Sequence, residues 1–336
     1  MGLGRIAGLL EDDALREKPC THAGAICADG EFILAAGADT DGERRRLFSE
    51  RWGKKGPLPV YAGAEEMLKA CAPDVLVIAT HPDSHERYCA LAAVSRVPVV
   101  ICEKPLADSL RAARRIAALE KKGGPVIIVN HERRYALDYR KAKQLINGGR
   151  FGPLLGVSAR LYMGTRRLLD VLWHDGTHLA DAVMYLSGMT LKHRKTWGAP
   201  LSAARGSAWL LGLLVREGAP VAPGERQRPV PFVMELGAGR DHLAFEMTFS
   251  LERGRLRIGN GIFELWESGP SPYAEQFRSL KKTEDGFAGK TGYFANMIRD
   301  AAACIRDPAR KPLSGAMDGL KAVEYLASAG RWGRAP

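Results

Sequence analysis

The chain places a lysine at the end of an apolar, β-branched run. Glu103-Lys104-Pro105 follows the segment 97–102, which is typical of a buried parallel strand. The carboxyl ends of such strands form the edge at which open α/β sheets bind ligands. A lysine held at that edge can reach a bound cofactor or substrate. The alternative is a solvated lysine in an ordinary strand-to-helix turn.

The first residues carry a glycine pattern that suits a dinucleotide. Gly2-Leu3-Gly4-Arg5-Ile6-Ala7 fits G-x-G-x-x-A, in which the glycines let the backbone approach a pyrophosphate at a helix N-terminus. A helical run is expected to follow. Gly2, Gly4, Arg5 and Ile6 are therefore predicted to contact the cofactor.

Asp39 ends the next apolar run and is expected to accept hydrogen bonds from the adenosine ribose, which favours NAD over NADP. Its spacing from the glycines is longer than usual and indicates an insertion around residues 17–30. Arg44–Arg46 follow shortly afterwards. As ligands of a 2′-phosphate they leave NADP open, although a solvated helix face is the preferred interpretation.

Only Met1 precedes the glycine pattern, whereas this fingerprint normally follows a strand. The first strand of a doubly wound sheet is central. Without it, the neighbouring strands would keep unpaired backbone groups, at about 1–3 kcal/mol each. We therefore expect a truncated first strand and a natural chain that starts upstream.

Two histidines form a second candidate centre. His174 and His178 are four residues apart, so in a continuous helix they would share a face and could bind a metal. No H-E-x-x-H glutamate accompanies them, and Gly176 lies between them. We predict no metal and interpret one histidine as an acid–base group. The alternative is a buried structural histidine.

Composition limits the partners. The net charge of +11 raises the question of nucleic acid, but the arginines form no compact run with interleaved aromatics. An enzyme for anionic cofactors or substrates can carry the same excess. No apolar window of 18 residues, no secretory signal and no C-x-x-C pair is present. We predict a cytoplasmic protein that binds neither nucleic acid nor membrane.

The elements that position these residues alternate in the first part of the chain. Strands are predicted over 32–38, 74–80, 97–102 and 125–130, and helices over 64–70, 86–94 and 109–122. Such β-α repeats indicate a parallel, doubly wound sheet.

Beyond residue 149 the pattern changes to half-polar segments. Strands are predicted over 154–163, 209–215, 232–236, 243–251 and 256–258, and helices over 177–186, 293–305 and 316–329. The alternation favours an antiparallel sheet with one packed face. We predict a dinucleotide-binding domain over residues 1–125 and a substrate-binding and oligomerisation domain over 126–336.

Five motifs, taken in order, resemble the Gfo/Idh/MocA oxidoreductase family, named after glucose–fructose oxidoreductase and inositol dehydrogenase. They are the residues 2–7, 79–85, Glu103-Lys104-Pro105, Arg133-Arg134-Tyr135 and 176–181. The resemblance covers nearly the whole chain. It implies an N-terminal Rossmann domain and a C-terminal α/β domain with an open, mostly antiparallel sheet, through which the chain would form a homodimer or homotetramer.

The resemblance also implies roles. The family's active-site lysine corresponds to Lys104 and its catalytic histidine to His178. In alcohol oxidation the nicotinamide takes a hydride, His178 would take the hydroxyl proton, and Lys104 would orient the hydroxyl and stabilise negative charge on its oxygen. Further cofactor contacts are expected from Thr80, His81, Pro82, His85 and Glu103, and further substrate contacts from Arg134, Tyr135, Arg166, His174 and Asp175.

His174 stands where the family often has aspartate or asparagine, so its part in catalysis differs from the usual pairing. Arg166 would meet a substrate carboxylate or phosphate, with a solvated arginine as the alternative.

The implied activity is NAD(P)-dependent hydride transfer with a secondary alcohol or ketone of a sugar, polyol or related cyclic compound. Two alternatives are a non-catalytic NAD-binding regulatory protein on the same scaffold and NAD-assisted elimination or glycoside cleavage. The presence of both Lys104 and His178 argues against a regulator.

Overall fold

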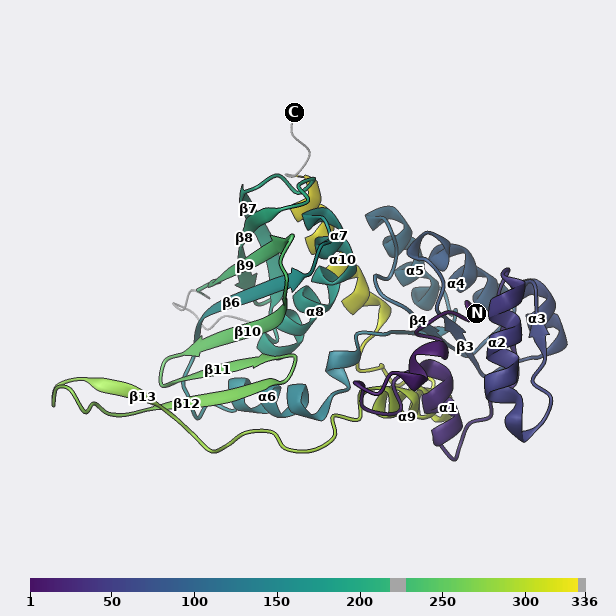
Figure 1. The fold of residues 1–336 in the computed structure, drawn as a ribbon, viewed down its shortest axis with the longest axis horizontal. Helices are drawn as coiled ribbons and strands as arrows, with labels where there is room; N and C mark the ends of the chain where they lie inside the picture. The colour runs from purple at the N-terminus through teal and green to yellow at the C-terminus, as the bar shows by residue number, and fades with distance from the viewer. Residues whose placement is uncertain (218–227, 332–336) are drawn as a thin grey trace. The chain divides into compact units, whose positions relative to one another are not determined.

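The computed structural model describes residues 1–217 and 228–331, which fold into two compact units (Figure 1). One unit comprises Met1–Leu137 and Lys290–Val323, and the other comprises Asp138–Gly289 and the residues from Glu324 onward. These units differ from the division at residue 125 expected from the sequence, because Lys290–Val323 joins the N-terminal part. The functional division into two domains stays a prediction.

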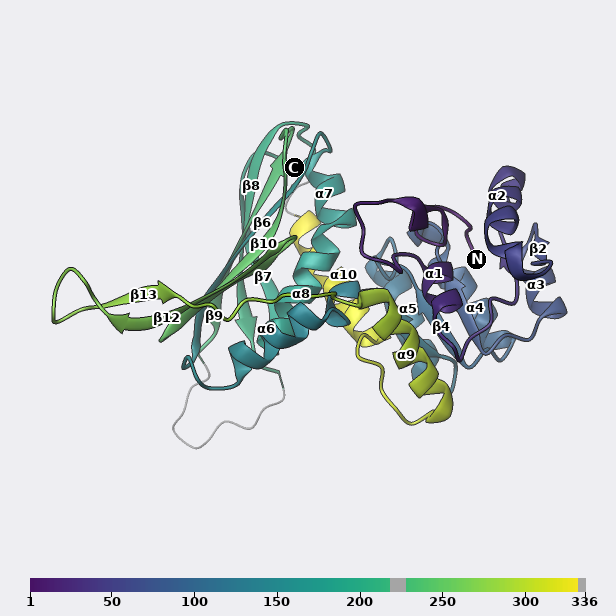
Figure 2. The same ribbon diagram turned by 60° about the horizontal axis from the view of Figure 1, so that its bottom comes forward.

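The first unit is a doubly wound α/β layer structure, as predicted. Its strands are β1 (Gly37–Ala38) paired in parallel with β2 (Val60–Tyr61), and β3 (Val75–Ile78), β4 (Val99–Cys102) and β5 (Val126–Val129) in a parallel sheet of that order. Its helices are α1 (His22–Ala28), α2 (Gly42–Trp52), α3 (Ala64–Ala70), α4 (His85–Val94), α5 (Leu110–Lys121), α9 (Tyr293–Arg306) and the start of α10 (Ala316–Arg331). Short 3-10 turns cover Leu9–Asp12, Gly53–Lys55, Pro82–Ser84 and Glu132–Arg134. Helices α4 and α5 cover one face of the β3–β5 sheet, and α1 and α9 lie on the other (Figures 1 and 2).

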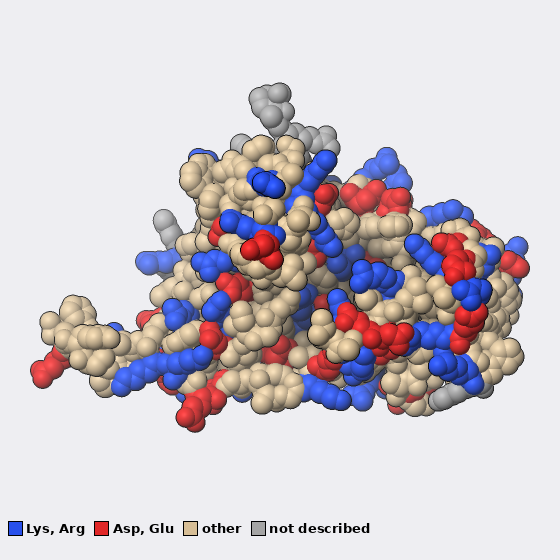
Figure 3. Space-filling view, viewed as in Figure 1, with Lys and Arg blue, Asp and Glu red and all other residues tan. Residues whose placement is uncertain are grey.

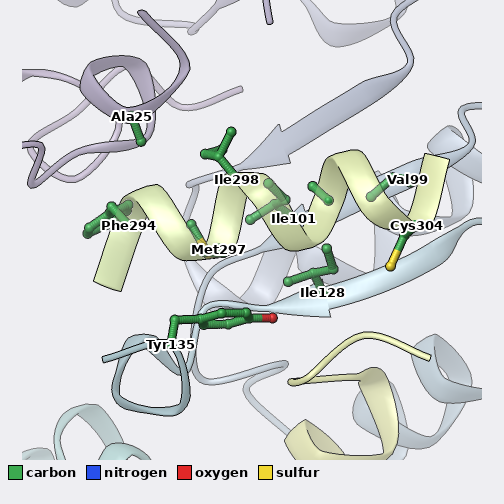
Figure 4. Close-up of a cluster of buried hydrophobic side chains, with 10 residues drawn as sticks. Ala25, Val99, Ile101, Ile128, Tyr135, Phe294, Met297, Ile298 and Cys304 are labelled. Atoms are coloured by element: carbon green, nitrogen blue, oxygen red, sulfur yellow. The ribbon is translucent and has the colours of Figure 1, made fainter. Parts of the chain in front are cut away.

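The core of this unit depends on the C-terminal helix α9. Phe294, Met297 and Ile298 recur at helical spacing and are buried against strand residues such as Val99 and Ile128 (Figure 4). A segment far along the chain therefore completes the packing of the N-terminal sheet.

The predicted strand over 32–38 is wrong for most of its length, because only Gly37 and Ala38 form β1. Met1 and Gly2 connect the two small sheets: Gly2 N–H donates to the Ala38 carbonyl, and Ala79 N–H donates to the Met1 carbonyl, both at 2.8 Å. Among the residues that the structure describes, no strand pairs with residues 32–36 on the β3 side, and a lone extended segment is not stable as a strand.

The described residues of the second unit form one eight-stranded sheet of order β13-β12-β11-β10-β6-β9-β8-β7, and among these strands only the β6–β9 pair is parallel. The prediction of an open, mostly antiparallel sheet is confirmed. The strands are β6 (Leu154–Met163), β7 (Thr190–Gly198), β8 (Gly206–Val215), β9 (Val230–Ala238), β10 (Leu243–Leu251), β11 (Gly254–Gly259), β12 (Ile262–Pro270) and β13 (Arg278–Lys282). Helices α6 (Leu137–Asn147), α7 (Leu168–His174) and α8 (Gly176–Ser187) lie on one face of the sheet (Figure 2).

Within the part of the chain that the structure describes, no helix has the length and apolar character needed to cross a bilayer. On the face shown in Figure 3, basic and acidic side chains are interspersed. Many basic side chains of the described residues pair with acidic ones, as Arg46 does with Glu43 and Glu50.

Candidate functional site

Gly2 and Gly4 of the glycine turn differ in what a side chain at each position would meet. Gly2 has a φ of +72°, and a Cβ there would lie 2.6 Å from the Ala79 carbonyl oxygen, so the turn itself requires glycine. At Gly4 a Cβ would meet nothing within 4 Å. Gly4 therefore borders open space, which fits a backbone cradle for the phosphates of a dinucleotide.

The helix expected directly after the turn is interrupted. Residues 4–8 form a turn that leads into a 3-10 segment, and α1 begins only at His22. Hydrogen bonds cross the interruption: His22 N–H donates to the Ile6 carbonyl at 3.2 Å, and Ala23 N–H donates to Ala7 at 2.8 Å. The segment between Ala7 and α1 therefore interrupts the expected helix and includes residues 17–21 of the predicted insertion, whose extent stays a prediction.

Asp39 stabilises the glycine turn through hydrogen bonds to main-chain N–H groups. Its carboxylate accepts from Leu3 N–H at 2.7 Å through Oδ2 and from Asp41 N–H at 2.9 Å through Oδ1. The Arg44 guanidinium lies 3.9 Å from the same Oδ2. Each carboxylate oxygen retains acceptor capacity. Ribose binding by Asp39 stays a prediction, and the structure adds that Asp39 fixes the glycine turn.

Glu103 lies in a buried polar network at the carboxyl ends of β4 and β5. Its Oε1 accepts from Asn130 Nδ2 at 2.6 Å and lies 2.7 Å from His22 Nε2. Burial favours a raised pKa for Glu103. The hydrogen bond and charge of His22 outweigh burial, with help from Asn130 and Lys104, and the pKa falls below its ordinary value. Glu103 thus links α1 to the sheet; its predicted cofactor contact is not tested by this arrangement.

Sequence reasoning missed His22 and Asn130. Asn130 follows β5 as Lys104 follows β4, so its position at the sheet edge was visible in the sequence. His22 lies 81 residues from Glu103, and no local pattern indicates that they meet.

Lys104 stands immediately after Glu103, beyond the end of β4, and its side chain is partly exposed. The Lys104 N–H donates to the Glu103 carboxylate at 3.3 Å. Helix α5 follows, capped by the Ser109 hydroxyl, which accepts from Ala112 N–H. The lysine therefore occupies the predicted sheet edge on a main chain held by a buried carboxylate.

His85 joins two loops of the same edge. Its Nε2 lies 3.1 Å from the Thr80 carbonyl, and its Nδ1 lies 3.2 Å from the carbonyls of Pro105 and Leu106. Burial lowers the pKa of His85. The Thr80 hydroxyl pairs with Ser84 at 2.7 Å, across the turn that contains His81 and Pro82. These contacts of His85 therefore fix the loop at Thr80. Direct cofactor contact by Thr80, His81, Pro82 and His85 stays a prediction.

Arg134 and Tyr135, predicted as substrate ligands, point into the interior of the first unit. Arg134 donates to the Leu313 carbonyl and pairs with Asp318, both at 3.0 Å. The Tyr135 hydroxyl donates to Asp300 at 3.1 Å, and burial raises the pKa of Tyr135. Both side chains are buried and hold the C-terminal segment in place. Their role as substrate ligands has no support in these contacts.

The histidine pair lies in the second unit and does not share one helix. His174 ends α7 and is exposed, whereas His178 is in the first turn of α8 and 9% exposed. Asp175 lies between the two helices. Its main-chain carbonyl accepts a hydrogen bond from His178 N–H at 3.1 Å, and its carboxylate forms an ion pair with Arg166 at 2.8 Å. Across the described residues, no three histidine, cysteine or acidic side chains converge as metal ligands.

Comparison with known proteins finds one family model that matches the N-terminal segment. Residues 4–131 match the GFO_IDH_MocA model, described as an oxidoreductase family with an NAD-binding Rossmann fold. This segment contains the glycine turn, Asp39, the loop at Thr80 and Glu103-Lys104-Pro105.

Inositol 2-dehydrogenase 2 of Saccharopolyspora erythraea is 31% identical over 160 residues, covering 46% of this chain and 43% of that protein. D-glucoside 3-dehydrogenase of Escherichia coli is 26% identical over 183 residues, half of each chain. The matches thus span about half the length of these curated relatives.

A solved oxidoreductase from Agrobacterium radiobacter, in complex with NAD+, L-tartaric acid and magnesium, has a TM-score of 0.69 at 16% identity. The match covers 93% of this chain and 92% of that one. At this identity the likeness shows a shared fold.

Proposed function

We propose, from the match of residues 4–131 to the model of the Gfo/Idh/MocA oxidoreductase family, that this chain is an NAD(P)-dependent dehydrogenase. It would move a hydride between the nicotinamide and a secondary alcohol or ketone of a sugar, polyol or related cyclic compound. The names of two relatives, an inositol and a glucoside dehydrogenase, support this substrate class.

The observation that carries the proposal is the placement of Lys104. It follows β4 at the carboxyl edge of the parallel sheet, the edge at which such folds bind ligands, with the open space at Gly4 in the same unit. The Glu103 network holds the main chain beneath it.

The chain's residues divide the work as follows. Gly2 and Gly4 would cradle the pyrophosphate, and Asp39 would receive the adenosine ribose. The bound dinucleotide supplies the hydride acceptor. Lys104 would donate a hydrogen bond to the substrate hydroxyl and stabilise negative charge on its oxygen. His178 would accept the hydroxyl proton.

Formation of NADH tests this proposal. The intact protein is incubated with NAD+ and a panel containing myo-inositol, its isomers and D-glucosides, and absorbance of the reduced nicotinamide is followed. We expect turnover of at least one cyclic alcohol, and a loss of about 100-fold or more in His178→Ala, since acid–base catalysis typically contributes that much. Lys121→Ala, an exposed lysine in the last turn of α5, is the matched control and keeps full activity.

Two outcomes would redirect the assignment. Tight NAD+ binding without any reduction across the panel would favour a regulatory protein on this scaffold. Cleavage of a glucoside with no net NADH would favour NAD-assisted elimination, in which the hydride returns to the product.

A further inference from the structure

A cavity of about 540 Å³ lies on the sheet of the second unit, where the β12–β13 hairpin extends beyond the neighbouring strands (Figure 1). The turn between β10 and β11 lines one side of it, and the hairpin lines the other. The lining includes two arginines, Arg255 and Arg278, and the hydroxyls of Ser250 and Ser268. A cavity of this volume can hold a small organic ligand.

These polar side chains share one face of the sheet. Phe249 on β10 is buried, so its neighbour Ser250 points to the opposite face. Ser250 is paired across the strands with Arg255 on β11, and Arg255 with Trp266 on β12. Paired residues of adjacent strands lie on the same face. Ser268, two residues beyond Trp266, follows on that face as well.

Arg255 is held by an indole ring and has no carboxylate partner. Its Cζ lies 4.1 Å from the centroid of the Trp266 ring. Its Nε–H is buried and has no hydrogen-bond acceptor among the residues that the structure describes. A buried donor of a charged group is unfavourable unless an acceptor is supplied. Arg255 therefore offers a fixed positive charge and free donors to an anion.

Ser268 orients the second guanidinium. Arg278 Nε donates to the Ser268 hydroxyl, and Arg278 Nη2 donates to the Ser268 carbonyl, both at 2.9 Å. In the described part of the chain, no carboxylate lies within ion-pair distance of Arg278. The Ser268 hydroxyl accepts from Arg278 and can still donate its own proton. Glu252, the acidic residue of the lining, is compensated by Arg253, whose Nη1 lies 3.0 Å from it.

We propose that this cavity binds a phosphate group, either as inorganic phosphate or as the phosphate monoester of a small molecule. Two guanidiniums match such a group, which carries a charge of about −1.5 to −2 at pH 7, whereas a carboxylate carries only one charge. Arg255 and Arg278 would bind its oxygens through paired N–H donors. The hydroxyls of Ser250 and Ser268 would donate to the oxygen that remains. This site lies in the second unit and does not depend on the proposed dehydrogenase activity.

Equilibrium dialysis of the intact protein at constant ionic strength tests the site. The two probes are inorganic phosphate and D-glucose 6-phosphate, and acetate is the competing monoanion. Arg255→Gln and Arg278→Gln each remove one guanidinium. Arg194→Gln, at an exposed arginine on β7 outside the cavity, is the control with the same change of charge. Circular dichroism verifies that each variant is folded.

We expect saturable binding of at least one probe with a Kd below about 1 mM. Arg255→Gln and Arg278→Gln should each raise that Kd by about ten-fold or more, because hydrogen bonds to a charged group are lost. Arg194→Gln should leave it unchanged. The probe with the lower Kd identifies the source of the phosphate group, free or esterified.

Three results would overturn the proposal. The first is uptake that does not saturate, or a Kd that both cavity variants leave unchanged. The second is displacement of the probes by acetate as effectively as by unlabelled phosphate, which would indicate a carboxylate site. The third is dissociation of an oligomer on addition of phosphate, seen by sedimentation velocity, because a carboxylate of a second copy would then be the occupant.

Discussion

At the scale of single residues, the Glu103 network shows how this unit keeps a buried carboxylate next to Lys104. An isolated buried carboxylate would be protonated or strongly destabilising. Here Asn130 donates to it, His22 contacts the same oxygen, and the Lys104 N–H reaches the other. The carboxylate therefore stays charged and fixes three segments at once.

The free energy of unfolding should depend on pH through the Glu103 carboxylate. Because the folded pKa of Glu103 is lower than the ordinary value of 4.5, its contribution is present above pH 4.5 and is lost as the pH falls through the folded pKa. Glu103→Gln should therefore lower the free energy of unfolding by about 1–3 kcal/mol at pH 7, with a smaller loss in acid. Urea unfolding at both pH values measures this, with exposed Glu275→Gln as control. An equal loss at both pH values would contradict a charged Glu103.

Under the proposed function, Lys104 takes part in the chemical step and contributes little to NAD+ binding. Lys104→Ala should lower kcat by about 100-fold or more, because the substrate oxygen loses its charged donor. NAD+ affinity should stay within a few-fold, since the glycine turn and Asp39 are untouched. Calorimetric titration of NAD+ into both proteins checks the second half. A large loss of NAD+ affinity would refute this division of roles.

At the scale of elements, two substitutions in the glycine turn should have different effects, one on stability and the other on NAD+ binding. Gly2→Ala should destabilise the fold by about 1–3 kcal/mol, because its φ is positive and its Cβ would strike the Ala79 carbonyl. Gly4→Ala should leave stability unchanged, because its Cβ meets nothing, yet weaken NAD+ binding by filling the cradle. Thermal unfolding and NAD+ titration of the two variants separate these effects. Unchanged NAD+ affinity in Gly4→Ala would place the phosphates elsewhere.

Elements with local signals were predictable from the sequence, and those decided by distant partners were not. Helix α3 has the predicted bounds of 64–70, because its acidic first turn and basic last turn are local features. The prediction of a strand over 32–38 was wrong for most of its length, because strand pairing depends on partner residues elsewhere in the chain. The interior contacts of Arg134 and Tyr135 were not predictable for the same reason, since their partners Asp300, Leu313 and Asp318 lie more than 160 residues away; a role in substrate binding stays a prediction.

At the scale of the whole molecule, the sheet of the second unit carries an apolar patch on its outward face at β7 and β8, beside charged residues such as Arg160, Glu235 and Glu246. Because α6–α8 lie on one face, alternate residues of each strand point outward on the other. Trp197, Trp209 and Leu211 belong to that outward set on β7 and β8, with Trp197 63% and Leu211 40% exposed. The two tryptophan rings lie 5.1 Å apart. We propose that this face joins copies of the chain.

Charged substitutions on this face should dissociate the proposed oligomer. Leu211→Arg combined with Trp197→Glu should convert a dimer or tetramer into monomers while the secondary structure is retained, because the substitutions lie on a solvent-facing surface of the single chain. Sedimentation velocity gives the oligomeric state and circular dichroism the fold. Tyr273→Glu, at a more exposed aromatic residue outside the patch, is the control. A wild-type protein that sediments as a monomer would exclude the interface.

The return of α9 to the first unit has a consequence for how the protein is made. A ribosome releases the strands of the N-terminal sheet long before it reaches Phe294, Met297 and Ile298, which complete their core. At about 5–20 residues per second, the nascent chain waits on the order of ten seconds with one side of that sheet uncovered. During that interval the emerging chain has to rely on chaperones or on slow collapse. For the same reason, a fragment cut after the last N-terminal strand would leave its apolar surface open to aggregation.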